Sequence, residues 1–201
     1  MYKYFFLMLS FAFLLQVSAQ DIKLTAPNKE AGKPLMKALS ERKSMRDFKK
    51  QDLPISVLSN LLWAANGFNR EDKRTSPTAN NKQEIELYVT LKSGVYFYDA
   101  KNQLLKLIKS GDFREQTGMQ DFVADVPLNI IFVADMEKAS SREYAYTDCG
   151  YISQNIYLFA ASEGLATVVR GSFDKDSLTT LLKLPSNQEV LLTQSVGYPK
   201  E

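Results

Sequence analysis

The alternation of hydrophobic and polar residues predicts a set of strands. The segment Ile85–Leu91 alternates, Ser93-Gly94 then forms a turn, and Val95–Tyr98 returns, which together predict a β-hairpin. The continuous apolar run Asn129–Ala134 is typical of a strand that is buried on both faces. Further strands are expected at 166–169 and 190–196, and the segment 104–108 fits either a short strand or a helical turn.

Helical spacing predicts helices between these strands. The first opens at Pro34, a residue that suits the first helical turn, and is expected to turn three apolar side chains inward: Leu35, Met36 and Leu39. The second begins at Leu53-Pro54 and is expected to end at Gly67. The later helices are expected at 144–163, closed by Gly164, and at 177–182. This mixture predicts an α+β fold with a central, mostly antiparallel sheet flanked by helices.

Residues 1–19 have the pattern of a signal peptide. A lysine near the start is followed by the apolar run Phe5–Leu15, which is too short to span a bilayer comfortably. Val17-Ser18-Ala19 places small residues at the cleavage positions, so cleavage before Gln20 is expected. An uncleaved membrane anchor is the alternative. The mature domain is then 20–201, and its expected location is the periplasm, reached by export of an unfolded chain.

Composition narrows the classes of function. The chain of 201 residues is 45% hydrophobic, which supports a folded core and a single domain after the leader. A formal net charge of +2 gives no support for a nucleic-acid-binding protein. Because the sequence has no histidine and one cysteine, Cys149, it excludes Ser-His-Asp and Cys-His catalysis and His-ligated or Cys-cluster metal sites. A hydrolase would need carboxylates or a lysine, and the acidic residues that lie closest in sequence resemble a solvated loop: Asp112, Glu115, Asp121 and Asp125.

Two polar stretches are long enough to be functional loops. One is Asn69–Lys82, which contains a turn by composition, Pro77-Thr78-Ala79-Asn80-Asn81. Its small side chains would allow the backbone to approach a flat ring, and Thr78 and Asn81 could hydrogen-bond the ring edge. An ordinary loop is the alternative. The other stretch is Gly111–Asp125, whose length and polarity permit a lid over a bound ligand.

A basic segment follows the first predicted helix. Arg42 and Arg46 are four residues apart, which makes them neighbours on a helix or at its end. Two guanidinium groups can bind a phosphate through paired hydrogen bonds, while Ser44 adds a hydroxyl donor and Lys43 a point charge. The alternative is a solvated basic patch at a helix C-terminus, where the helix dipole favours cations.

A third candidate segment lies where the predicted strand at 166–169 ends, at Arg170-Gly171. Glycine has no side chain, so Gly171 would let a backbone amide face a ligand. An ordinary connection between two elements is the alternative. Together the basic segment, the turn and this corner suit a phosphorylated, planar organic cofactor, whose chemistry the protein would position.

Taken in order, these segments resemble the nitroreductase-like flavoprotein family, with features of its SagB-type branch. The resemblance extends from about Leu35 to Pro199 and depends on the order and spacing of its motifs, since no single motif is specific. The motifs are Arg42-Lys43-Ser44-Met45-Arg46-Asp47-Phe48, a Leu- and Ala-rich helix at 57–66, the turn from Pro77 to Gln83, the stretch from Gln154-Asn155 to Gly164-Leu165, and Gly197-Tyr198-Pro199. The SagB-type features are Arg74-Thr75, Glu86-Leu87-Tyr88-Val89 and Gly94-Val95-Tyr96-Phe97-Tyr98.

The resemblance implies an intertwined homodimer that binds FMN, with both active sites at the subunit interface. The phosphate and the ribityl chain would be bound by Arg42, Lys43, Ser44 and Arg46. The isoalloxazine ring would be approached from the partner subunit by Pro77, Thr78, Ala79 and Asn81. Arg170 and Gly171 would lie against the ring near N5, and Lys200 is the candidate at the C-terminus to complete the phosphate site.

The resemblance also implies the reaction. FMN would take hydride and pass electrons to a quinone, a nitroaromatic or a similar small organic acceptor, so no side chain is expected to act as a nucleophile. The alternatives are a SagB-type dehydrogenase that oxidises azolines in a peptide, and a flavin-binding module without turnover. An exported protein would work where NAD(P)H is not normally present. We therefore expect a different electron donor, such as a membrane quinol or a partner protein, and no stable membrane span after leader cleavage.

Overall fold

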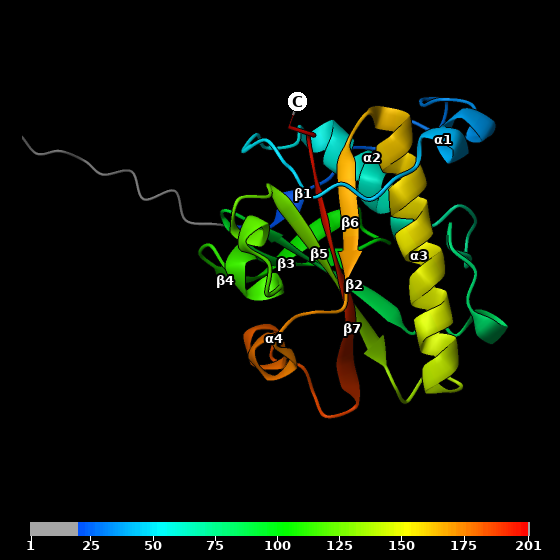
Figure 1. Ribbon diagram of the computed structural model, residues 1–201. Coiled ribbons are helices and arrows are strands. Elements are labelled where there is room, and N and C mark those ends of the chain that lie inside the picture. The colour runs from blue at the N-terminus through cyan, green and yellow to red at the C-terminus, as the bar shows by residue number, and fades with distance from the viewer. Residues whose placement is uncertain (1–19, 201) are drawn as a thin grey trace, which may run out of the picture.

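A central antiparallel sheet organises the structure, a computed structural model that describes residues 20–200 (Figure 1). Its strands are β1 (Ile22–Lys23), β2 (Ile85–Leu91), β3 (Gly94–Asp99), β4 (Leu104–Ser110), β5 (Leu128–Asp135), β6 (Ala166–Arg170) and β7 (Gln188–Gly197). In space they follow the order β1-β4-β3-β2-β5-β7-β6, and every neighbouring pair among the described residues is antiparallel. The predicted sheet is confirmed, whereas the leader at 1–19 lies outside the described residues.

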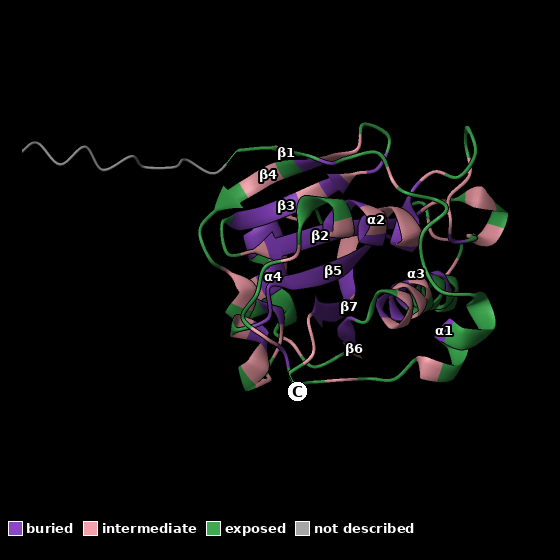
Figure 2. Ribbon diagram, turned by 90° about the horizontal axis from the view of Figure 1, so that it is seen from above, coloured by how far each residue is buried: buried purple, intermediate pink, exposed green. Residues whose placement is uncertain are grey.

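The strands follow the sequence pattern closely. β2 and β3 form the predicted hairpin through a two-residue turn at Lys92-Ser93, with Leu91 paired to Gly94. The segment 104–108, which fitted a strand or a helical turn, is part of β4 and pairs with β3. Every residue of β5 is buried, as the apolar run predicted, because helices cover both faces of the sheet at its centre (Figure 2).

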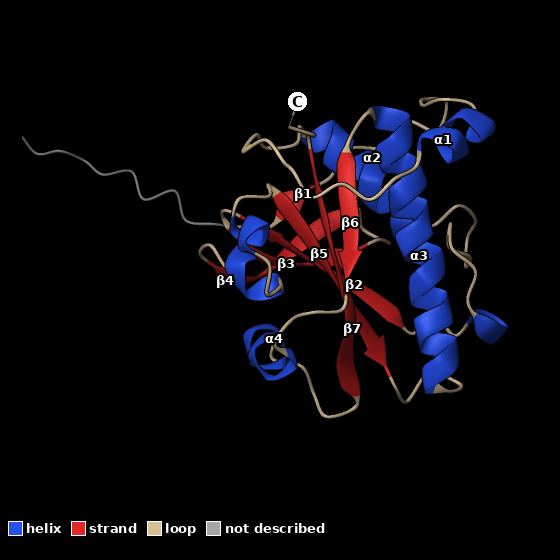
Figure 3. Cartoon of the chain, viewed as in Figure 1, coloured by secondary structure: helices blue, strands red, loops and turns tan. Residues whose placement is uncertain are grey.

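The helices divide between the two faces of the sheet. They are α1 (Leu35–Glu41), α2 (Ile55–Asn66), α3 (Arg142–Glu163) and α4 (Lys175–Leu182). α1, α2 and α3 lie on one face and α4 lies on the other, as the view from above shows (Figure 2). Figure 3 shows the resulting layers of helix and strand. Among the described residues, no helix is long and apolar enough to cross a membrane.

The ends of the two long helices have local causes. α2 follows Pro54, whose fixed backbone suits a helix start, and ends before Gly67 as predicted. α3 begins after Ser141, whose Oγ accepts the backbone N–H of Tyr144 at 3.3 Å. It ends at Gly164, which adopts a left-handed conformation (φ 71°) that glycine tolerates without strain.

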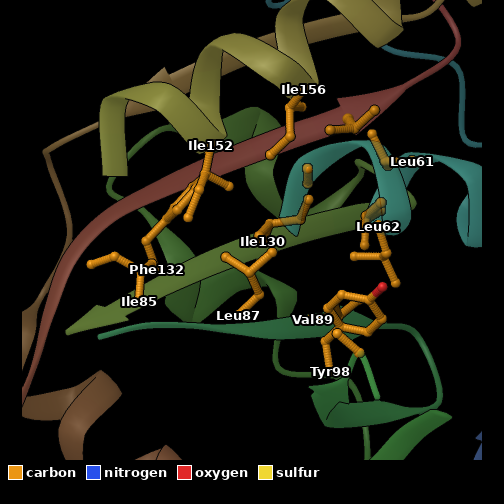
Figure 4. Close-up of a cluster of buried hydrophobic side chains, with 14 of the residues drawn as sticks. Leu61, Leu62, Ile85, Leu87, Val89, Tyr98, Ile130, Phe132, Ile152 and Ile156 are labelled. Carbon is orange, nitrogen blue, oxygen red and sulfur yellow. The ribbon is translucent and has the colours of Figure 1, made fainter. Parts of the chain in front are cut away.

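The larger hydrophobic core lies between the sheet and helices α2 and α3 (Figure 4). Its fully buried side chains include Leu61, Leu62, Ile130, Ile152 and Ile156. Burying an aliphatic side chain of this size contributes roughly 1.5–3 kcal/mol, so this layer fixes α3 firmly against the sheet. A second core on the opposite face joins α4 to β2, β3, β5 and β7. α3 is thereby a rigid support for the segments that lie against it.

The prediction that α1 turns its large apolar side chains inward was wrong. Leu35, Met36 and Leu39 are 62%, 76% and 44% exposed, and the buried residue of α1 is Ala38. The helix is short and lies at the surface beside α3, so its small alanine makes the close contact and its larger side chains face outward. These exposed side chains form an apolar surface on the helical face of the molecule.

Candidate functional site

The basic segment is extended, not helical. α1 ends at Glu41, and Arg42 already has φ −56° and ψ 122°. The Met45 N–H donates to the Thr167 carbonyl of β6 at 3.0 Å. Side chains alternate along an extended chain, so Arg42, Ser44 and Arg46 share one side of the segment. The two arginines, expected to be neighbours on a helix or at its end, therefore share one side of an extended segment that follows the end of α1, and Lys43 lies on the other side.

The two arginines are available for a ligand. Arg42 and Arg46 are exposed, and neither forms an ion pair with a residue in the described part of the chain. The Arg42 guanidinium lies 5.4 Å from the centre of the Tyr157 ring, a distance typical of a cation–π contact. The positive charge of this surface is thus not neutralised by any acidic residue in the part of the chain that the structure describes.

Tyr157 joins the basic segment to β6, a role that no local sequence pattern indicates. Its buried hydroxyl accepts the Val169 N–H at 3.1 Å and lies 2.8 Å from Ser44 Oγ. Because Tyr157 can donate its own proton to Ser44, the Ser44 hydroxyl proton can point to a ligand. A cavity of about 420 Å³ lies next to this junction, and its lining includes Lys43, Tyr157 and Leu165.

The C-terminal residues return to the same place. The Lys200 N–H donates to the Asp47 carbonyl at 3.1 Å, and Phe48 pairs with Pro199. The exposed Lys200 is therefore held against the backbone of the residue after Arg46, and its role in completing a phosphate site stays a prediction.

The corner at the end of β6 divides into an inward side chain and an open backbone. The Arg170 guanidinium is buried, and it donates to the Thr117 carbonyl at 2.9 Å and to Asn129 Oδ1 at 3.0 Å. Burial lowers the pKa of Arg170 to about 10, so it remains charged at neutral pH. Gly171 is exposed, with no atom within 4 Å of the position that a Cβ would occupy. The exposed backbone at Gly171 is therefore free to make the contact with the flavin ring that was expected near N5. The Arg170 side chain is not, because it is bonded inside the protein.

The turn at 77–81 contains a short 3₁₀ helix, Ala79–Asn81, that is stabilised mainly by side chains of its own loop. Thr78 Oγ1 accepts the Gln83 N–H at 3.1 Å. The Asn81 amide donates to the Asp72 carbonyl at 3.3 Å and accepts from Gln83 Nε2 at 3.1 Å. The Asn81 side chain was expected to hydrogen-bond the ring edge, but it is already bonded within its own loop. Pro77, in contrast, is exposed.

The turn is also tied to α3 through a pair of carboxyl groups that sequence reasoning did not identify. Asp148 Oδ2 accepts the Ala79 N–H at 3.1 Å. Asp148 also lies within reach of the carboxyl group of Glu84, the residue before β2, and both side chains are buried. Residues 84 and 148 lie far apart in the sequence, so no local pattern could have paired them.

Within one chain, the turn and the basic segment contact opposite sides of α3. The turn is bonded to Asp148, and the basic segment to Tyr157. These residues are nine positions apart, which on an α-helix is about two and a half turns, a rise of about 13 Å and a rotation of about 180°. The structure therefore brings the basic segment, Lys200 and the edge of β6 together, with Gly171 just after the end of that strand, and it places the turn elsewhere.

Residues 39–198 match the model of the nitroreductase family. The chain belongs to this family. Over 176 residues it is 28% identical to a protein of Methanocaldococcus jannaschii that is provisionally named a nitroreductase, covering 79% of this chain and 88% of that protein. This family membership supports oxidoreductase activity of a general kind.

Solved structures of nitroreductase-family proteins have the same fold. A protein of Ralstonia eutropha, provisionally named a nitroreductase, superposes with a TM-score of 0.85 at 36% identity, covering 92% of each chain. A Clostridium difficile protein described as an FMN-dependent nitroreductase has a TM-score of 0.60 at 21% identity, covering 83% of this chain and 88% of that one.

The segment 111–125 of this nitroreductase-family chain is anchored at several points. The Met119 N–H donates to the Ser172 carbonyl at 3.1 Å, and Asn129 Nδ2 donates to the Val123 carbonyl at 3.1 Å. Among the acidic residues considered for a hydrolase, Asp112 pairs with Arg114, and Asp125 with Lys50. Those two acids, like Glu115 and Asp121, are exposed, as expected for a solvated loop.

Proposed function

We propose that the protein is an FMN-dependent oxidoreductase that passes hydride or electrons from a reduced donor to a small organic acceptor, such as a quinone or a nitroaromatic. The observation that carries the proposal is the surface formed by Arg42, Ser44 and Arg46, whose charge no described acidic residue neutralises. Family membership and the FMN-dependent relative from Clostridium difficile support it.

The donor set fits FMN. Guanidinium groups bind a phosphate through paired, charge-assisted hydrogen bonds, and a hydroxyl such as that of Ser44 suits a ribityl chain or a phosphate oxygen. The exposed backbone at Gly171 leaves room for a flat ring to approach closely. When bound, FMN supplies the redox chemistry by accepting and releasing hydride at its ring. The protein supplies position and charge.

The side chains offer no competing covalent mechanism. The sequence has no histidine, and the single cysteine, Cys149, is buried. Burial, followed by the nearby charge of Asp148, raises the pKa of the Cys149 thiol, so the thiol stays protonated and inert. The residues of this site therefore bind and orient a cofactor and do not attack a substrate.

The proposed active unit is a homodimer. Since the turn and the basic segment lie on opposite sides of α3 in one chain, the turn would serve the site of the second copy. The exposed face of α3, which includes Gly150, Tyr151 and Gln154, offers a contact surface, as do the exposed apolar side chains of α1. Large aromatic residues and methionine are enriched at such interfaces, which supports the assignment of this face.

We further propose that the protein is exported and that its donor is not NAD(P)H. The signal-peptide pattern at 1–19 supports export, and a membrane quinol or a partner protein could then reduce the flavin. Stopped-flow mixing of the FMN-loaded protein with NADH, NADPH and a soluble quinol tests this proposal. Rapid bleaching of the flavin by either nicotinamide would contradict it.

The first test of the function is FMN binding. The purified protein should show the absorption bands of bound oxidised flavin, or acquire them when FMN is added. Arg42→Ala and Arg46→Ala should each weaken FMN binding by roughly 10- to 100-fold, since a hydrogen bond to a charged group is worth about 1.5–3 kcal/mol.

Arg142→Ala is the matched control for this test. Arg142 is an exposed arginine at the far end of α3, where it pairs with Glu189, and its loss should leave FMN affinity unchanged. A colourless protein that ignores added FMN would overturn the proposal. A protein that binds FMN but is reduced by no donor would instead be a flavin-binding module without turnover.

A further inference from the structure

Two buried carboxyl groups meet behind the turn at 77–81. Glu84, at the residue before β2, is 1% exposed, and Asp148, on α3, is 2% exposed. Their carboxyl groups lie within reach of each other, and the buried Glu84 Oε2 has no hydrogen-bond partner in the described part of the chain. Two carboxyl groups can form a hydrogen bond only when one of them is protonated, so a proton on Glu84 would give its buried carboxyl group a partner in Asp148.

The surrounding groups do not neutralise a second negative charge. On β5, the Asp135 N–H donates to the Glu84 carbonyl, and the Asp135 carboxylate is paired with Lys138. On α3, the thiol of Cys149 is neutral because burial raises its pKa. The turn itself presents only the uncharged N–H of Ala79 to the pair.

Arg74, a cation of the same loop, is also engaged elsewhere. Arg74 donates to Gln83 Oε1 at 3.0 Å and to the Asn66 carbonyl at 2.9 Å. The charged group that acts on Glu84 is thus Asp148, and the pair behaves as two acids that share a site.

The pair is connected to the part of the molecule expected to contact the flavin ring. Asp148 Oδ2 accepts the Ala79 N–H, the hydrogen bond that joins the turn to α3. The turn and the residues just after it include three positions with positive φ, namely Asn80 (53°), Asn81 (56°) and Gln83 (51°). Such conformations are uncommon for residues other than glycine and persist only when the surroundings hold them in place.

We propose that Glu84 and Asp148 share one proton and act as a positioning pair that holds the 77–81 turn in the shape that receives the flavin ring. This role rests on the proposed function, because the turn matters to the reaction only if FMN binds. With Glu84 protonated, its hydroxyl donates to Asp148 and fixes that carboxylate under the Ala79 N–H. With Glu84 ionised, two negative charges face each other, and their repulsion displaces Asp148 and frees the turn.

The direction of the pH dependence follows. Burial, followed by the hydrogen bond and the charge of Asp148, raises the pKa of Glu84 to about 7, against a weaker opposing effect of its own backbone N–H. The proton is therefore lost as the pH rises above neutrality, and FMN affinity should fall over the same range.

The experiment measures the FMN dissociation constant from about pH 6.5 to about pH 9 in the full chain and in two variants. In the wild type the affinity should fall roughly tenfold or more as the pH rises. Glu84→Gln keeps a neutral donor to Asp148, so its affinity should match the wild type at the acidic end of this range and stay constant. Glu86→Gln, two residues further along the chain in β2, is the control and should keep the wild-type pH dependence, including any contribution from FMN itself.

A carboxyl ¹³C NMR titration of the protein without FMN reads the shared proton directly. Glu84 should titrate well above its ordinary range, and Asp148→Asn should return its pKa toward that range. Identical pH dependence of FMN affinity in the wild type and Glu84→Gln, or a Glu84 that titrates near its ordinary value, would overturn the proposal. If no variant binds FMN at any pH, the proposed function fails and so does the positioning role, while the NMR titration still decides whether the proton is shared.

Discussion

Arg170 links the end of β6 to the segment 111–125. Its guanidinium donates to Thr117, Gln120 and Asn129, and a Cβ added at Gly118 would lie 1.8 Å from Arg170 Nη1. A buried charged donor in this position satisfies several acceptors at once, so its removal would take this donor from the Thr117 carbonyl and leave Asn129 Oδ1 with Ser195 Oγ alone. Arg170 thus serves the scaffold behind the proposed flavin site.

We expect Arg170→Leu to destabilise the protein by about 2–3 kcal/mol, because the carbonyl of Thr117 and the amide of Asn129 lose a buried donor. The free energy of unfolding, measured with urea, checks this prediction. Arg142→Leu, at an exposed position, should change the stability by less than about 0.5 kcal/mol. Equal stability of the two variants would show that the Arg170 network does not stabilise the fold.

The raised pKa of Glu84 leads to a separate prediction about the free energy of unfolding. Its pKa is raised from 4.5 to about 7, so the folded chain binds the proton more tightly than the unfolded chain. The stability from this group is complete below about pH 4.5, declines as the pH rises, and is lost above about pH 7. Urea unfolding at about pH 5 and about pH 8.5 should show this decline in the wild type but not in Glu84→Gln. A parallel decline in Glu84→Gln would assign the effect to other groups.

Among the elements, α3 contacts the basic segment on one side and the 77–81 turn on the other. Tyr157→Phe removes the hydroxyl that joins Ser44 to Val169, and we expect FMN affinity to fall roughly tenfold because the basic segment loses its support. The FMN dissociation constant measures this loss. Tyr144→Phe, at an exposed position of the same helix, is the control. An unchanged affinity in Tyr157→Phe would mean that the backbone bond of Met45 alone positions the segment.

The elements were predictable wherever a local period decides them. The apolar run at 129–134 predicted a buried strand, and Gly164 ends α3 where its sequence indicated. The orientation of α1 was not predictable, because its spacing shows that Leu35 and Met36 are apolar but does not show which surface covers them. Sequence periodicity shows which residues of a helix share a face, but it does not show whether that face contacts the same chain, another molecule or solvent.

The candidate site was predictable only as segments. The basic segment and the turn were recognisable by composition, but their joining residues are distant in sequence: Ser44 meets Tyr157, and Glu84 meets Asp148. Hydroxyl and carboxylate side chains are common on helices, and the sequence around them does not show whether they have a distant partner. Tertiary packing, which brings helix α3 against both segments, creates these pairs.

At the scale of the whole molecule, substitutions at Gly150 test the proposed homodimer. Gly150 lies on the exposed face of α3, and in the single chain no atom lies within 4 Å of the position that a Cβ would occupy there. We expect Gly150→Phe to leave the single chain folded but to obstruct the second copy, giving a monomer by light scattering and at least a roughly tenfold loss of FMN affinity. Gly150→Ala adds only a methyl group and should retain the dimer. A dimeric Gly150→Phe that binds FMN normally would place the interface elsewhere.

The bond between Met45 and Thr167 has a consequence for solubility. β6 is an edge strand of the sheet, and its outward backbone groups at Thr167 and Val169 are taken by the Met45 N–H and the Tyr157 hydroxyl. Unpaired edge strands invite pairing with other chains and aggregation. The segment proposed to bind the phosphate therefore also caps an open sheet edge, so selection against aggregation would constrain it even in a descendant that had lost its cofactor.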